Sequence, residues 1–340
     1  IWLTTGKCPD VVKVETPIGK TLYLDVIPGA MGVCSVIKDA GDDPDVTDKS
    51  EIVTQVELLP EEGEITFVGG EGIGVITEEG LKLPVGEYAI NPVPRAMTVK
   101  ALREIIGPQA ARVTVSVPGG GELAKKTFNP RLGIQGGLSI LGTTGIVRPM
   151  SEEAMKDSLL VELDMYARQG HRSIVFVLGT TGENALKAEY GAFTCVLQVS
   201  NYIGFMIEEA VERGFTNILI GGFVGKLVKV ASGTMNTHSH VADGRRETVC
   251  TFAALNGAQR PLIEKLYQCR TIQKNIEVIK EAGLECIWDQ IAETAAHKCR
   301  LRTGGNIKIG VMLLDKDGEI IGSSENISDV LLAVTKGEKG

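Results

Sequence analysis

The stretch Ser173-Ile-Val-Phe-Val-Leu-Gly-Thr-Thr-Gly182 indicates how this chain folds. A short apolar run rich in β-branched residues passes directly into a glycine–threonine turn. Such a run is typical of a strand that is buried on both faces of a parallel sheet. A second strand of this kind, residues 217–220, ends in Gly221-Gly222, and amphipathic helices are expected over 151–168 and 202–212. This pattern predicts βαβ units around a parallel sheet.

The chain before residue 133 has a different pattern, with short strands separated by turns rich in glycine, proline and acidic residues. The expected strands are 11–15, 20–26, 31–38, 52–59, 64–68 and 112–117, with one helix over 98–106. A helical stretch, 248–299, and a hairpin around Asp315-Lys-Asp-Gly318 complete the chain. We therefore expect a strand-rich α+β domain over 1–132 and a Rossmann-like α/β domain over 133–340.

Composition limits the classes of protein to consider. The chain has 340 residues, of which 43% are hydrophobic and 23% charged, so it has room for two globular domains. It contains neither a run of 18 apolar residues nor a secretory leader, and we expect no membrane partner. A net charge of −8 argues against a nucleic-acid partner. Seven cysteines without a Cys-x-x-Cys pair favour reduced thiols and a cytoplasmic location, and a homodimer stays open.

Leu-Gly-Thr-Thr-Gly occurs twice, at 141–145 and at 178–182, each time after an apolar segment. In a parallel sheet the carboxyl ends of the strands line a ligand crevice. Glycines let a ligand approach the backbone, and threonine hydroxyls can bond its oxygens. The alternative is a set of tight strand-to-helix turns. We expect a cofactor site formed by Gly142, Thr143, Thr144, Gly145, Gly179, Thr180, Thr181, Gly182, Gly221 and Gly222. The dinucleotide fingerprint is absent, and its nearest match, Gly70-Glu-Gly-Ile-Gly74, opens no convincing helix.

Residues 220–247 gather the polar chemistry of the chain next to glycines. Lys226 and Arg245 are candidate ligands for an anionic substrate. His238, with Asp243, is a candidate for acid–base or hydrogen-bonding work at a pocket. A zinc site is not expected, because no third histidine or cysteine ligand lies near in sequence. Serine hydrolase chemistry is not expected either, since no Gly-x-Ser-x-Gly elbow occurs.

Two features of the first half allow two interpretations each. In Asn91-Pro-Val-Pro-Arg95 the prolines predict an extended path that would hold Arg95 ready for a carboxylate or phosphate. The same prolines could instead form a rigid crossover between domains. Asp39–Asp48 carries five aspartates and is either a solvated loop or a divalent-metal loop. It lacks the glycine and the closing glutamate of a calcium-binding helix–loop–helix.

Taken together, several stretches resemble one family, the cobalt-precorrin-5B C1-methyltransferases of the anaerobic cobalamin pathway. The resemblance spans nearly the whole chain, in order. It rests on Gly69–Thr77, Ala89–Arg95, Ile140–Val147, Gly225–Lys229 and Asn236–Ser239 with Ala242-Asp243. One departure is the segment Thr4-Thr5-Gly6, which leads here directly into Lys7-Cys8-Pro9 instead of an alanine-rich helix.

The resemblance implies transfer of a methyl group from S-adenosylmethionine to C1 of cobalt-precorrin-5B, which gives cobalt-precorrin-6A. Cobalt would arrive with the corrinoid substrate, so no protein-bound metal is expected. Arg95, Lys226, His238 and Arg245 would face the corrinoid, and the glycine–threonine turns would hold the cofactor. Two other classes stay open: a nucleotide or phosphate-substrate enzyme that uses the same glycine edge, and a non-catalytic corrinoid-binding protein.

Overall fold

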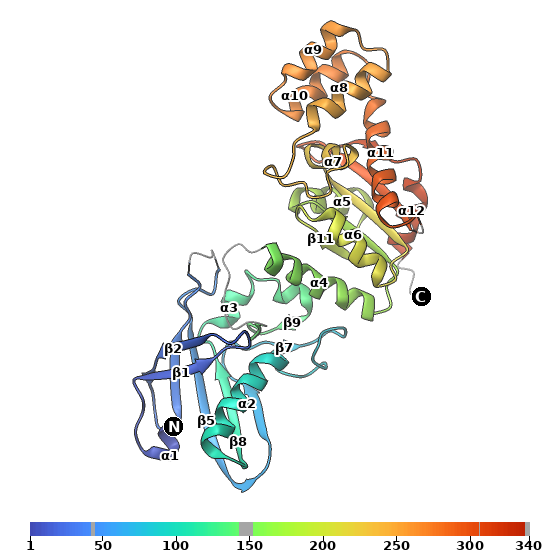
Figure 1. The fold of residues 1–340 in the computed structure, drawn as a ribbon. Helices are drawn as coiled ribbons and strands as arrows, with labels where there is room; N and C mark the ends of the chain where they lie inside the picture. Colours follow the sequence, from blue (N-terminus) through green and yellow to red (C-terminus); the bar gives the residue numbers. More distant parts are fainter. Residues whose placement is uncertain (42–44, 143–151, 306, 337–340) are drawn as a thin grey trace. The chain divides into compact units, whose positions relative to one another are not determined.

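The computed structural model describes residues 1–41, 45–142, 152–305 and 307–336, and it divides into two units, 1–155 and 156–340 (Figure 1). This division lies after the boundary expected at 132/133. The reason is local: β9 (Ile134–Gln135) pairs with β7 (Val75–Ile76) in the first unit. Among the described residues, no helix combines the length and the apolar character needed to cross a membrane.

The first unit is built on a five-stranded sheet with the order β3-β4-β5-β8-β6. Neighbouring strands are antiparallel except for β6 and β8, which run parallel. The first two expected strands are confirmed and form a hairpin, in which β1 pairs with β2 in register from Val11↔Asp25 to Glu15↔Thr21. The strands are β1 (Val11–Glu15), β2 (Thr21–Asp25), β3 (Ile27–Pro28), β4 (Val33–Ile37), β5 (Glu51–Glu62), β6 (Ile65–Gly69) and β8 (Gln109–Ser116).

Glycines allow close backbone packing in this unit. A Cβ on Gly72, which has φ 73°, would lie 2.0 Å from the carbonyl oxygen of Val117. A Cβ on Gly70 or on Gly74 would likewise overlap the side chain of Ser116 or Ile134, so close packing explains these glycines without a nucleotide. The remaining elements of the unit are the short helices α1 (Trp2–Thr5) and α3 (Gly120–Ala124), the 3-10 helix η1 (Asn129–Leu132) and the longer helix α2 (Pro92–Ile106).

Helix α2 corrects the sequence-based expectation of an extended path through residues 91–95. The helix starts at Pro92, and the amide of Arg95 already donates to the carbonyl of Asn91. Prolines are tolerated in a first helical turn because the amide hydrogens there have no partner within the helix. Arg95 therefore lies on a helix rather than on a strap between domains.

The second unit contains the predicted parallel sheet, with the order β11-β10-β12-β13-β14. Strands β10 to β13 run parallel, and β14 pairs antiparallel with β13 as the hairpin around Gly318 predicts. Numbered along the chain, the strand order is 2-1-3-4-5, so the direction of winding reverses between β10 and β12. The strands are β10 (Ser173–Val177), β11 (Val196–Gln198), β12 (Asn217–Phe223), β13 (Lys308–Leu314) and β14 (Ile320–Ser323).

Helices cover both faces of this sheet (Figure 1). Ile174 and Phe176 of β10 belong to a core that also contains residues of α4, α6, α7 and α11. Val175 and Val177 point to the opposite face, where α5 and α12 pack. This alternation is the period-2 pattern of a strand buried on both faces. The helices are α4 (Glu152–Arg168), α5 (Thr180–Tyr190), α6 (Ile203–Glu212), α7 (Val224–Ala231), α8 (Arg245–Leu255), α9 (Arg260–Gln268), α10 (Ile272–Glu281), α11 (Ile287–Arg302) and α12 (Ile327–Lys336).

Two further expectations about the glycine turns were wrong in detail. Residues 138–141 form no strand of the parallel sheet, because Leu138 and Ile140 make isolated bridges to Ile73 and Ile90 in the first unit. Gly142 follows them there, and Thr143, Thr144 and Gly145 lie outside the described residues. Gly221-Gly222 does not end its strand, since β12 continues through Phe223.

Candidate functional site

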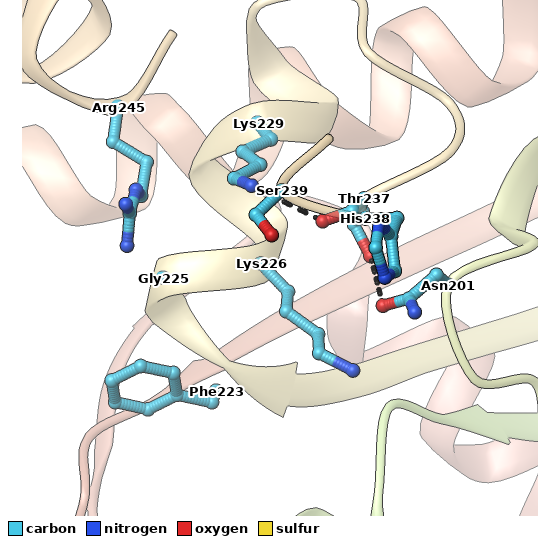
Figure 2. A pocket seen from close by; sticks show the side chains of 9 residues that line it. All are labelled: Asn201, Phe223, Gly225, Lys226, Lys229, Thr237, His238, Ser239 and Arg245. Atoms are coloured by element: carbon cyan, nitrogen blue, oxygen red, sulfur yellow. Dashed lines mark hydrogen bonds between the residues drawn. The ribbon is translucent and has the colours of Figure 1, made fainter. Parts of the chain in front are cut away.

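A cavity of about 340 Å³ lies at the start of α7, where the chain leaves the carboxyl end of β12. The carboxyl ends of parallel strands, next to the point where the winding reverses, are the usual ligand position in such a sheet. Figure 2 shows side chains from α7, from the loop after it and from the turn after β11 around this space. The lining residues are Asn201, Phe223, Gly225, Lys226, Lys229, Thr237, His238, Ser239 and Arg245.

The cavity is lined by three cationic side chains that would attract an anion: Lys226, Lys229 and Arg245. Lys226 is half-buried and has no hydrogen-bond or ion-pair partner among the residues that the structure describes. Burial lowers the pKa of Lys226, and the neighbouring charge of Lys229 lowers it further. Lys229 is only 4% exposed and donates to the carbonyl of Thr237 at 3.1 Å. An anionic ligand near Lys226 would offset both the burial and the repulsion.

Asp243 is held by Arg245 rather than offered to a substrate. The guanidinium donates from Nε to Oδ1 at 2.7 Å and from Nη2 to Oδ2 at 2.5 Å. These hydrogen bonds lower the pKa of Asp243 to about 2, with further contributions from the Arg245 amide and from the charges of Arg245 and Lys229, although burial opposes them. A carboxylate with so low a pKa is a weak base near neutral pH. The geometry therefore favours a role for Asp243 in orienting Arg245.

His238 lies in a turn, with its ring against that of His240. The ring centroids are 4.9 Å apart at an interplanar angle of 80°. The amide of Val241 donates back to the carbonyl of His238 at 3.1 Å and closes this turn. The amide of His240 donates to Nδ1 of His238 at 3.3 Å. Since Nδ1 is an acceptor here, the neutral ring carries its proton on Nε2 and is a hydrogen-bond donor at that atom.

Sequence reasoning missed Asn201, Thr237 and Ser239 as lining residues. Asn201 follows β11, a strand of only three residues that no periodic pattern reveals. One local signal exists in the structure: Ser200, directly before it, has φ 53°, which is uncommon for a residue other than glycine. In the sequence, Thr237 belongs only to a stretch that carries the family resemblance. Its contacts with Asn201 depend on tertiary packing.

The glycine edge of the same sheet divides into an open part and a packed part. Gly179, at φ 118°, has no atom within 4 Å of a built Cβ, and Thr180 and Thr181 after it are exposed at the start of α5. Gly221 and Gly222 face inward, where a Cβ would lie 2.4 Å from Leu186 and 3.0 Å from Leu178 respectively. Gly182 is also closely packed, because its Cβ would lie 3.2 Å from the Cα of Gly222. Close packing of α5 and of the end of β10 against β12 thus explains three of these glycines.

The guanidinium of Arg95 forms its hydrogen bonds within the first unit. Its Nε donates to the carbonyl of Ile90 at 2.7 Å, and its Nη2 donates to Glu87 at 2.7 Å and to the carbonyl of Tyr88 at 3.3 Å. The guanidinium also lies over the ring of Phe67, 5.7 Å from the centroid. These bonds tie the start of α2 to the preceding segment and give Arg95 a structural role.

The described aspartates of the acidic loop bond to protein groups. Asp45 accepts from Lys38 and Thr47, Asp48 from the amide of Ala40, and Asp39 from the amide of Gly41. Residues 42–44 lie outside the described part of the loop. Within the described residues, no group of three or more histidine, cysteine or acidic side chains has the arrangement of a metal site.

An α/β unit with a cation-lined cavity at the carboxyl ends of parallel strands has the features of proteins that bind anionic small molecules. Comparison with known proteins is more specific. The sequence profile of the CbiD family matches residues 1–149, and that of the CbiD C-terminal domain matches residues 236–325. The second match includes four of the nine residues that line the cavity, namely Thr237, His238, Ser239 and Arg245, whereas both lysines precede it.

Similar proteins include the cobalt-precorrin-5B C(1)-methyltransferase of Alkaliphilus metalliredigens, which is 44% identical over 91% of this chain and 84% of its own. The protein of the same name from Thermoanaerobacter sp. (strain X514) is 42% identical over 96% of this chain and 91% of its own. A crystal structure of a cobalamin biosynthesis protein (cbiD) from Archaeoglobus fulgidus is 30% identical, covers 70% of this chain and 75% of its own, and has a TM-score of 0.35. This chain belongs to the CbiD family.

Proposed function

We propose that this protein methylates C1 of cobalt-precorrin-5B with S-adenosylmethionine as methyl donor, giving cobalt-precorrin-6A in cobalamin biosynthesis. Relatives that carry this methyltransferase name are 42–44% identical over more than nine tenths of the chain. The observation that supports the substrate class is the cavity at α7, where the half-buried Lys226 lacks a partner among the described residues. The acetate and propionate groups of a corrinoid would supply the missing negative charge.

The cavity suits one edge of the macrocycle rather than the whole ring. Its volume of about 340 Å³ is at the lower end of the range for small-molecule pockets. Lys226, the remaining Nη1 of Arg245 and Nε2 of His238 would each donate to a carboxylate there, while Asp243 keeps the guanidinium in place. Arg95, with its three internal hydrogen bonds, is not part of this proposed contact set.

The start of α5 fits the cofactor. The first backbone amides of α5 and the hydroxyls of Thr180 and Thr181 can donate to the carboxylate or the ribose oxygens of S-adenosylmethionine. The open space at Gly179 leaves room for the cofactor to approach them. When bound, the cofactor supplies an electrophilic methyl group on a sulfonium. The protein then needs to hold the ring carbon and this methyl group in line and to exclude water, and a covalent nucleophile is not required. A contribution from Gly142 and residues 143–145 stays a prediction.

The test is a methylation assay together with binding measurements on one variant and its control. The wild-type protein is incubated with cobalt-precorrin-5B and methyl-labelled S-adenosylmethionine, and label transfer to the corrinoid is followed. Lys226→Met should raise KM for the corrinoid about 10- to 100-fold, the usual loss for a charge-assisted bond. Lys298→Met removes an exposed lysine on α11 and should change nothing. Both variants should bind S-adenosylmethionine with wild-type affinity in calorimetry.

The same experiment separates the alternatives. Corrinoid binding without any label transfer would favour a non-catalytic corrinoid-binding protein. Activity that persists after complete removal of S-adenosylmethionine would refute the methyltransferase. The cytoplasmic location, the absence of a nucleic-acid partner and a homodimer stay predictions.

A further inference from the structure

Asn201 lines the cavity and directly follows a residue whose backbone conformation is unfavourable. It lies in the turn between β11 and α6, which closes when the amide of Tyr202 donates to the carbonyl of Val199 at 3.0 Å. Ser200 adopts φ 53° within this turn. Such a conformation costs free energy for a residue with a side chain, and it persists where the surrounding structure or a function requires it.

A chain of hydrogen bonds fixes the orientation of the Asn201 amide. The hydroxyl of Thr237 donates to Oδ1 of Asn201 at 3.1 Å, and the amide of Thr237 donates to the Asn201 carbonyl at 2.9 Å. Thr237 is held in turn by Lys229, whose Nζ donates to its carbonyl at 3.1 Å. Thr237 and Lys229 are 3% and 4% exposed, so both bonds lie in a setting where an unmade bond is costly.

The Nδ2 group of the Asn201 side chain is available to a ligand. Because Oδ1 accepts from Thr237, the Nδ2 group of Asn201 is the free end, and within the described part of the chain it has no hydrogen-bond partner. Asn201 and Lys226 both line the cavity, and Figure 2 shows their side chains on the same side of it. The two side chains thus offer only donors to a ligand, one neutral and one cationic.

We propose that Asn201 is a further substrate-contacting residue, which donates from Nδ2 to the same substrate carboxylate that Lys226 binds, and that Thr237 and Lys229 are positioning residues for its amide. This inference rests on the proposed function for the identity of the substrate. A carboxylate has two oxygens and four acceptor positions, so one group can accept from both donors at once. A ligand group that itself donates hydrogen bonds would leave both side chains unpaired.

Asn201→Asp is the decisive variant, because it exchanges one NH₂ for an oxygen and keeps the shape. The new carboxylate can still accept from the hydroxyl of Thr237, and it repels a substrate carboxylate while it pairs with Lys226. We expect KM for cobalt-precorrin-5B to rise at least tenfold, with kcat and the affinity for S-adenosylmethionine within a factor of about two. The dissociation constant of cobyrinic acid, a cobalt corrinoid with free carboxylates, should rise by the same factor.

Asn236→Asp is the matched control. It adds the same charge to the loop after α7, which carries Thr237 and His238. The Oδ1 atom of Asn236 already accepts from the amide of His238 at 3.1 Å, and Asn236 does not line the cavity. The positioning role of Thr237 is tested by Thr237→Val, which removes the hydroxyl without a change of shape. That variant should raise KM about three- to tenfold at constant kcat, and Thr237→Ser should restore the wild-type value because it restores the donor.

The outcomes separate this inference from the proposed function. Label transfer by the wild-type protein tests the function, and the ratio of the cobyrinic acid dissociation constants of Asn201→Asp and Asn236→Asp tests the inference. A ratio near one, or a Thr237→Ser variant as impaired as Thr237→Val, would overturn the role of Asn201 even if the wild-type protein is an active methyltransferase. A ratio of ten or more would support it even if no methyl group is transferred.

Discussion

Gly221→Ala decides whether the glycine pair of β12 serves a ligand or the packing of α5. The sequence pattern suggested the first, and the structure places Leu186 against this glycine. A Cβ on Gly221 would lie 2.4 Å from Cδ1 of Leu186, which is far inside van der Waals contact. Leu186 is 1% exposed and belongs to the core between α5 and the sheet, so it has little room to move.

The magnitude follows from two opposing terms. Overpacking a core by one methyl group costs about 1–3 kcal/mol, whereas replacing a strand glycine by alanine recovers about 0.5–1 kcal/mol of backbone entropy. We expect Gly221→Ala to lower the free energy of unfolding by about 1–2 kcal/mol. Leu186→Ala alone should cost about 2–5 kcal/mol through the cavity that it leaves. In the double variant the new methyl group occupies part of that cavity, so the two losses should fall short of additivity by about 1 kcal/mol or more.

The assay is urea unfolding followed by the fluorescence of Trp288, which is buried in the second unit, in a Trp2→Phe background. Each folded variant is also titrated with S-adenosylmethionine, and its affinity should equal that of the parent. Additive losses in the double variant would show that the two side chains do not compete for space. Unchanged stability with lost cofactor binding in Gly221→Ala would refute the packing explanation and support the role in cofactor binding.

Two further predictions concern charged side chains. Asp243 has a folded pKa of about 2, below its ordinary 3.8, so its pairing with Arg245 stabilises the fold above about pH 4 and is lost as the pH falls through about 2. Because the Asp243 carboxylate is 46% exposed, we expect the pair to contribute under about 1 kcal/mol to the free energy of unfolding. This contribution should be missing from the pH dependence of urea unfolding in Asp243→Asn. The variant should keep most of its activity at neutral pH. Arg95→Met should destabilise the first unit by about 1.5–3 kcal/mol through its lost bonds to Glu87 and two carbonyls, with KM for the corrinoid unchanged. Thermal unfolding and steady-state kinetics check this, with the exposed Lys100→Met as control; a raised KM at wild-type stability would restore Arg95 to the substrate site.

The sequence by itself determined most of the secondary structure, because hydrophobic period and turn residues are local properties. The hairpin of β1 and β2, the helices α4 and α6 and the apolar strand β10 lie within a few residues of their predicted bounds. It also located the polar side of the cavity, since Lys226, His238 and Arg245 follow a buried strand and glycines. The missed strand β11 is too short for a period to show.

Only the tertiary structure decided which of these residues are in contact and which of their side chains are charged or already paired. The apolar segments before the two Leu-Gly-Thr-Thr-Gly copies have different surroundings, because bridges to Ile73 and Ile90 draw residues 138–140 into the first unit, whereas β10 lies in the parallel sheet of the second. Asn201 and Thr237 are 36 positions apart and become partners only when β11 and α7 pack into one unit. Asp243 changes from a candidate base to a fixed anion because its pKa depends on the guanidinium beside it. Contacts between distant segments carry no local sequence signal, and burial and neighbouring charge set the chemistry of a side chain.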